Sequence, residues 1–223
     1  MGQDEIIKDI RQRCRMAMNG IASTSMREHG LVYKLNFGLV IKQIKDLSER
    51  YDKSIDLAEA LWKEETRELK ILSTFLYPAE KLSAEKAYKL ATEIANQEIR
   101  EQLCLNLFQE VAFADQLGIE WSNSDDIEIR TTGYWLLVRL LLAKKFRGIL
   151  SFDYFQFIWD DITSENIFLR NASSLVLKHI GRQSEDDAKA ILEKIAIYRN
   201  SPNRLESEAY ENISFEFDFF WGK

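Results

Sequence analysis

The chain has 223 residues, of which 46% are hydrophobic and 30% are charged, and its 36 acidic and 30 basic side chains give a net charge of −6 at pH 7. Its nine glycines and two prolines are too few for an all-β sandwich or barrel, because such folds need a tight turn after every short strand. The acidic total argues against a dedicated nucleic-acid binder, although a local basic face can coexist with it.

Hydrophobic residues recur at helical spacing through the first half of the chain. A first helix is predicted over residues 4–18, because Ile6, Ile7, Ile10 and Cys14 fall on one of its faces. The other helices expected before residue 114 cover residues 38–51, a short segment capped by Ser54, residues 66–77 ended by Pro78, a segment capped by Ser83, and residues 98–113.

The same spacing continues to the C-terminus after a loop predicted around Gly118, Trp121, Ser122 and Asn123. Five more segments are expected to be helical: 125–144 capped by Ser124, one that begins at Ser151, one from Ser164 to Gly181, one begun by Ser184 with Asp187, and the aromatic tail 204–221. Gly133, inside the long helix, indicates a kink or a close backbone approach.

Successive pairs of these helices repeat every 30 to 40 residues, and no composition shift or flexible linker separates them. This organisation predicts a single all-α domain over residues 1–223, an α-α superhelix of about ten to eleven helices of the HEAT-repeat type. A globular helical bundle would show similar periodicity. The tail is expected to cap the exposed face of the last repeat.

Metal and membrane chemistry find little support in the sequence. The two cysteines lie 90 residues apart, only two histidines are present, and the acid pairs sit at helix starts, where they complement the helix dipole. We therefore expect neither a metal nor a cofactor. The N-terminal segment lacks an apolar signal core, and the longest apolar run, 133–143, is short and contains Arg139, so a cytoplasmic protein without membrane contact is predicted.

Several segments resemble the HEAT-like DNA alkylation repair family, the AlkD-type glycosylases. The resemblance is most specific at 57–62, Leu-Ala-Glu-Ala-Leu-Trp, and at 66–72, Thr-Arg-Glu-Leu-Lys-Ile-Leu. Weaker matches follow the family's order at 36–40, 129–132 and 169–181, so the resemblance covers about residues 36–181.

The resemblance implies a C-shaped superhelix whose concave face holds duplex DNA, and an activity that removes alkylated purines. An alkylated purine is cationic, so its glycosidic bond is weak, and a carboxylate beside the deoxyribose can stabilise the sugar cation and orient a water molecule. Such an enzyme requires no cofactor.

At the family's catalytic helix the sequence departs from the pattern Trp-Asp-x-Val-Asp. The essential carboxylate corresponds to Glu110 and the tryptophan to Asn106, with Asp115 as a weaker alternative carboxylate. The family's paired arginines reduce to Arg130, which would contact a phosphate or steady Glu110. These changes leave open a second reading, in which the protein is a catalytically inactive repeat scaffold that binds DNA structure or a protein partner.

Seven further residues are candidates for DNA contact, either as aromatic replacements or as phosphate-binding cations. They are Trp121, Trp135, Lys144, Lys145, Arg147, Lys178 and Arg182. Each has an alternative structural role: the tryptophans as core packing, the cations as a solvated face, Arg130 as an ion-pair partner within the fold, and Glu110 as a solvated acid at a helix end.

Overall fold

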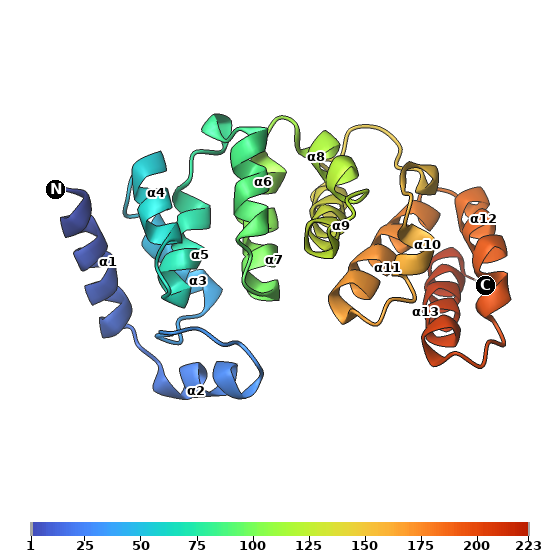
Figure 1. Ribbon diagram of the computed structural model, residues 1–223, viewed down its shortest axis with the longest axis horizontal. Coiled ribbons are helices and arrows are strands. Elements are labelled where there is room, and N and C mark those ends of the chain that lie inside the picture. Colours follow the sequence, from blue (N-terminus) through green and yellow to red (C-terminus); the bar gives the residue numbers. More distant parts are fainter. Residues whose placement is uncertain (1, 223) are drawn as a thin grey trace. The chain divides into compact units, whose positions relative to one another are not determined.

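In the computed structural model, which describes residues 2–222, the chain is built from helices (Figure 1). These residues form thirteen α-helices and four short 3₁₀ helices, without a strand. The all-α prediction is confirmed, and the helix number lies above the predicted ten to eleven. By its internal contacts the chain divides into two compact units, Met1–Ala112 and Phe113–Lys223.

In the first unit the most extensive helix packing is between α4 and α5, and α5 also contacts α1, α3 and α7. Buried leucines and isoleucines, among them Leu61, Leu69 and Ile71, form its core. The α-helices are α1 (Gln3–Met16), α2 (Gly20–Glu28), α3 (Ile41–Ser48), α4 (Ile55–Trp62), α5 (Arg67–Leu76), α6 (Ala84–Thr92) and α7 (Gln97–Asn106), with the short 3₁₀ helices η1 (Ala79–Lys81) and η2 (Phe108–Glu110).

In the second unit α9 packs against α8 on one side and α11 on the other. A single apolar cluster runs through it, from Tyr134 and Leu137 to Ile213 and Phe217. Its helices are α8 (Ala114–Trp121), α9 (Ile127–Leu142), α10 (Ile158–Asp161), α11 (Ile167–Gly181), α12 (Glu185–Ile195) and α13 (Arg204–Trp221), with the 3₁₀ helices η3 (Phe152–Tyr154) and η4 (Ala196–Tyr198).

Side-chain caps begin most of these helices. Ser54, Ser83 and Ser184 accept backbone N–H groups of the first turn as predicted. At α9 and α11 the predicted caps Ser124 and Ser164 lie two residues too early. Asp126 and Asn166 cap those helices, and each serine instead accepts the N–H of the residue that caps the helix.

The predicted loop around Gly118 is wrong, because residues 114–121 form α8. Gly118 is there for packing: a Cβ at this position would lie 2.8 Å from Leu137 on α9. On α9, a Cβ at Gly133 would lie 2.7 Å from the carbonyl carbon of Trp121. The two glycines thus allow α8 and α9 to approach closely, which confirms the predicted backbone approach at Gly133 and identifies its neighbour.

Two further predictions need correction. Helix α2 was not predicted, although Asn19 caps it, and the helix expected over 38–51 begins only at Ile41. Gly181 ends α11 as predicted, but its smallness is required because a Cβ there would overlap the ring of Phe217 on α13. Helix α13 therefore covers the end of α11, in agreement with a capping tail.

Within the described residues, every helix is too short or too polar to cross a bilayer.

Candidate functional site

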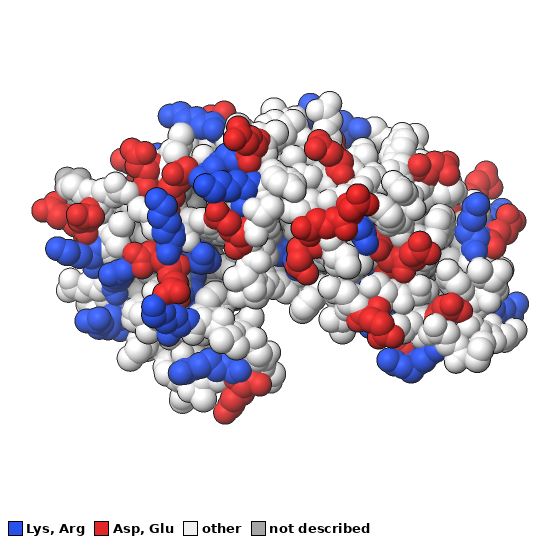
Figure 2. Space-filling model, in the orientation of Figure 1, with Lys and Arg blue, Asp and Glu red and all other residues white. Residues whose placement is uncertain are grey.

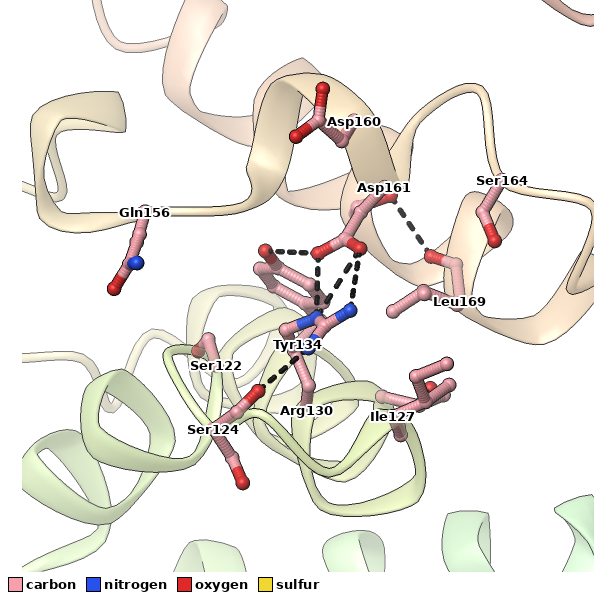
Figure 3. Close-up of polar contacts among 12 residues, drawn as sticks. Ser122, Ser124, Ile127, Arg130, Tyr134, Gln156, Asp160, Asp161, Ser164 and Leu169 are labelled. Carbon is pink, nitrogen blue, oxygen red and sulfur yellow. Dashed lines mark hydrogen bonds and ion pairs between the residues drawn. The ribbon is translucent and has the colours of Figure 1, made fainter.

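Arg130 lies at the centre of a buried polar cluster in the second unit (Figure 3). Its Nε donates to Oδ2 of Asp161 at 3.0 Å and its Nη2 to Oδ1 at 3.1 Å. Its Nη1 donates to the Ser124 carbonyl at 2.7 Å, and the guanidinium lies 4.5 Å from the centre of the Phe157 ring. The hydroxyl of Tyr134 donates to Asp161 at 2.9 Å.

Burial controls the ionisation of this cluster. It raises the pKa of the Asp161 carboxyl above its ordinary value, against the opposing effects of Arg130 and Tyr134. It also raises the pKa of the Tyr134 hydroxyl, and the neighbouring Asp161 carboxylate adds to that effect. Tyr134 therefore remains a proton donor, and Arg130 and Tyr134 together satisfy the buried carboxylate.

A second buried cluster in the first unit follows the same plan. Arg67 donates from Nη2 to Glu98 at 2.6 Å, and this pair, like Arg130 and Asp161, is separated by 31 residues. The fully buried Glu68 accepts the backbone N–H groups of Phe37 and Gly38, each at 3.0 Å, and that of Leu39 at 3.3 Å. The Arg-Glu pair of the family resemblance thus holds the segment before α3 in place.

Basic side chains near helix starts have a repeated structural role that the sequence did not reveal. Lys70 donates to the Trp62 carbonyl at 2.7 Å, Arg130 to the Ser124 carbonyl, and Arg170 to the Ser164 carbonyl. Each cation satisfies a carbonyl at the end of, or after, the preceding helix, where backbone acceptors lack intrahelical partners. The sequence signal available for this role was the recurrence of an Arg or Lys near the start of α5, α9 and α11.

The predicted carboxylates lie on short elements. The helix expected over 98–113 ends at Asn106, and Glu110 is an exposed residue at the end of η2. Asn106 donates to Thr74 at 2.9 Å and to Gln102 at 3.0 Å, so it has a structural role. Asp115 lies in the first turn of α8, with Oδ2 3.7 Å from Arg147 Nε and with a buried Oδ1 that has no hydrogen-bond partner.

Glu110 belongs to the first unit and Arg130 to the second. The predicted cooperation of these two residues therefore stays a prediction. In the structure, Arg130 forms an ion pair with the buried carboxylate of Asp161. This pair within the fold is the alternative structural role expected for Arg130.

The tryptophans considered as DNA contacts take part in packing. Trp121 is 2% exposed and lies at the end of α8 beside Gly133. Trp135 is partly buried against the core of the second unit, and its buried indole Nε1 has no hydrogen-bond partner. Trp62, from the family resemblance, donates to Glu93 at 2.6 Å beneath the ammonium group of Lys70.

The basic candidates fall into two groups. Lys144, Lys145 and Arg147 are exposed in the turn that follows α9, where Lys144 has a φ of 55°. Lys178 and Arg182 instead converge on Glu216 of α13. Burial raises the pKa of the Glu216 carboxyl, but the hydrogen bond and charge of Arg182 outweigh it and hold the pKa below its ordinary value. A phosphate would have to compete with this carboxylate.

A hollow of about 760 Å³ in the first unit lies between α1 and residues 50–57. Two of its lining residues hold the Asp9 carboxylate: Arg13 donates to Asp9 at 2.8 Å and Tyr51 to the same carboxylate at 2.7 Å. The predicted site residues are not among those that line it. Among residues 2–222, no three His, Cys, Asp or Glu side chains are grouped so that they could hold a metal ion.

Comparison with known proteins places this fold. A solved structure described as "a new family of proteins related to the HEAT-like repeat DNA glycosylases with affinity for branched DNA structures" matches with a TM-score of 0.69 and 14% identity, over 95% of this chain and 94% of that one. At this identity the likeness shows the fold, and it confirms the predicted HEAT-like repeat. Among curated proteins none matches. The model of the DNA alkylation repair enzyme family matches residues 14–213, and this protein therefore belongs to that family.

Proposed function

We propose that this protein binds duplex DNA, including branched duplexes, with the turn after α9 as a phosphate-binding segment. The observation that carries the proposal is the exposure of Lys144, Lys145 and Arg147 within six residues of the end of α9. Exposed lysines and arginines supply most of the affinity of proteins for DNA. Membership of a DNA alkylation repair family and the likeness to a protein described as having affinity for branched DNA support this choice of ligand.

Lys178 and Arg182 are weaker candidates for the same role. Both are held by Glu216, and burial lowers the pKa of the Lys178 ammonium. A phosphate at this position would have to displace the Glu216 carboxylate from the two cations.

Replacing Lys144 and Lys145 with alanine is expected to weaken DNA binding and to make it less sensitive to salt. Loss of two phosphate contacts reduces the slope of log K against log salt by about 1.8. Fluorescence anisotropy on a 20-base-pair duplex and on a four-way junction, over a series of salt concentrations, measures both quantities. The matched control is Lys189→Ala, since Lys189 is an exposed lysine of α12 in the same unit. An unchanged slope in the double variant contradicts the proposal.

A second activity, excision of cationic alkylpurines, is favoured by the exposed carboxylate of Glu110. In this reaction the N-glycosidic bond breaks, the base leaves with the bonding electrons as a neutral purine, and water adds to the sugar carbon and gives up a proton. An anionic carboxylate stabilises the positive charge that develops on the sugar and can accept that proton. In Glu110 the carboxylate stands on a longer side chain than the aspartate of the family pattern.

Glu110→Gln is expected to reduce the release of 7-methylguanine and 3-methyladenine from methylated duplex DNA by about 10²–10³-fold, because the amide carries no charge to stabilise the sugar cation. The control is Glu120→Gln, which removes an exposed carboxylate from α8. Chromatography of the released bases at excess protein provides the measurement.

Two outcomes would count against this assignment. If the wild-type protein releases neither base, the excision activity is excluded while the binding proposal stands. If Glu110→Gln retains full release, the carboxylate is another one, and Asp115→Asn tests the alternative.

A further inference from the structure

The last helix presents an unpartnered aromatic face. Phe215 and Phe219 of α13 are 72% and 79% exposed, and their rings stack with centres 6.5 Å apart. Three acids are exposed on the same helix: Glu211 four residues before Phe215, Asp218 three residues after it, and Glu208 seven residues, or about two turns, before it. We call these five residues the tail face. An exposed aromatic pair with a rim of polar groups is typical of an interaction site.

The first helix presents a face of opposite character. Lys8, Arg11, Arg15 and Met16 of α1 are exposed at spacings of three, four and one residues, and Met16 is 80% exposed. We call these four residues the head face. Arg11 also contacts Glu64 at 2.6 Å and remains about half exposed. From residue 10 to residue 45 the chain has seven lysines and arginines and one acid, Glu28. In Figure 2 blue side chains lie along α1, with a red cluster at its N-terminal end, and the first turn of α1 contains the acids Asp4 and Glu5.

We propose that the tail face of one molecule packs against the head face of a second copy. On each face the apolar side chains stay exposed rather than packed against another part of the described chain, Phe215 and Phe219 on one and Met16 on the other. The charges of the two faces are opposite in sign. The tail face has three carboxylates, of which Glu208 pairs with Arg204, and the head face has three cations, of which Arg11 pairs with Glu64. The apolar components are also matched, because the two phenylalanines can pack against Met16 and the aliphatic stems of the basic side chains.

The pairing is head-to-tail, because the two faces differ. Each copy in such a pair retains one unused face, so the contact does not close on itself in a dimer and can continue to further copies. The average mass in solution should therefore rise with protein concentration and fall with added salt, since the charged rim is screened. This inference goes beyond the proposed DNA binding and does not depend on it.

Two single-face variants test the contact. Phe215→Ser/Phe219→Ser removes the apolar part of the tail face, and Lys8→Glu/Arg15→Glu reverses the charge of the head face. Light scattering coupled to size exclusion should show wild-type masses above the 26.1 kDa of one chain at high concentration. Each variant alone should stay at the mass of one chain. Ile149→Ser, which changes an equally exposed apolar residue elsewhere, should behave as wild type.

The decisive measurement is the mixture of the two variants. One variant supplies an intact head face and the other an intact tail face, so an equimolar mixture should form a species of twice the single-chain mass and nothing larger. The proposal is overturned if the wild-type mass stays at one chain at every concentration, or if the mixture does not associate. It is also overturned if the head-face variant loses only affinity for DNA, since that face then serves the nucleic acid.

Discussion

Glu68→Ala is expected to lower the free energy of unfolding by about 3–5 kcal/mol, the usual cost of removing one partner from a buried charge network. The substitution removes the acceptor of three backbone N–H groups, those of Phe37, Gly38 and Leu39. It also takes one carboxylate from Arg67, whose Nη1 donates to Glu68 at 3.2 Å. Buried donors without acceptors carry the full cost of their lost hydration.

Urea unfolding followed by circular dichroism measures this loss. Glu68→Gln retains one amide oxygen as an acceptor, so its destabilisation should be smaller than that of the alanine variant. Glu65→Ala is the matched control, since Glu65 is an exposed acid three residues earlier that pairs with the exposed Lys34. Its free energy of unfolding should lie within about 0.5 kcal/mol of the wild-type value. A Glu68→Ala protein as stable as this control would contradict the structural role assigned to the buried carboxylate.

Asp161→Ala is expected to have a similar effect in the second unit, again about 3–5 kcal/mol. The variant leaves the Arg130 guanidinium and the Tyr134 hydroxyl in a buried environment without their shared acceptor. The neighbouring Asp160→Ala provides the control, because Asp160 is exposed and points away from Arg130 in Figure 3.

A double variant separates the buried charge from the loss of packing. Replacing both partners, Arg130→Met with Asp161→Leu, removes the ion pair without leaving an unpaired charge and should recover most of the stability lost in Asp161→Ala. If the double variant is no more stable than the single one, the cost lies in packing rather than in the unpaired guanidinium. The same double variant, assayed for DNA binding, tests whether Arg130 contacts a phosphate as the sequence predicts.

The sequence predicted the parts of this fold that depend on local patterns. Helical spacing, serine caps and the near absence of turn residues were sufficient for the all-α assignment, and the motif at 57–72 identified the family. Glycine was the ambiguous signal, because the same residue ends helices and allows them to approach closely. Gly118, expected in a loop, lies inside α8, and Gly181 ends α11 as expected, and each also accommodates a side chain from another helix.

The site was harder to predict, because the role of a charged residue depends on its partner in space. The sequence shows Arg130 beside a family motif, but not that Asp161, 31 residues later, lies opposite it. Likewise, Glu216 lies 34 residues beyond Arg182 and gives no sequence signal of the pairing. Cations that appear equivalent along the chain are therefore divided by the fold into those paired with a carboxylate of another helix, such as Arg130 and Arg182, and the exposed group at 144–147.

The short sequence separation of these contacts bears on how the protein forms. In the second unit, hydrogen bonds join Arg130 to Asp161, Leu150 to Gln183, and Arg182 to Glu216, across 31, 33 and 34 residues. Contacts between residues so near along the chain favour rapid folding, because only modest loops are closed at each step. We expect each helix pair to assemble on the preceding one as it leaves the ribosome, so that the protein folds in the order of its synthesis.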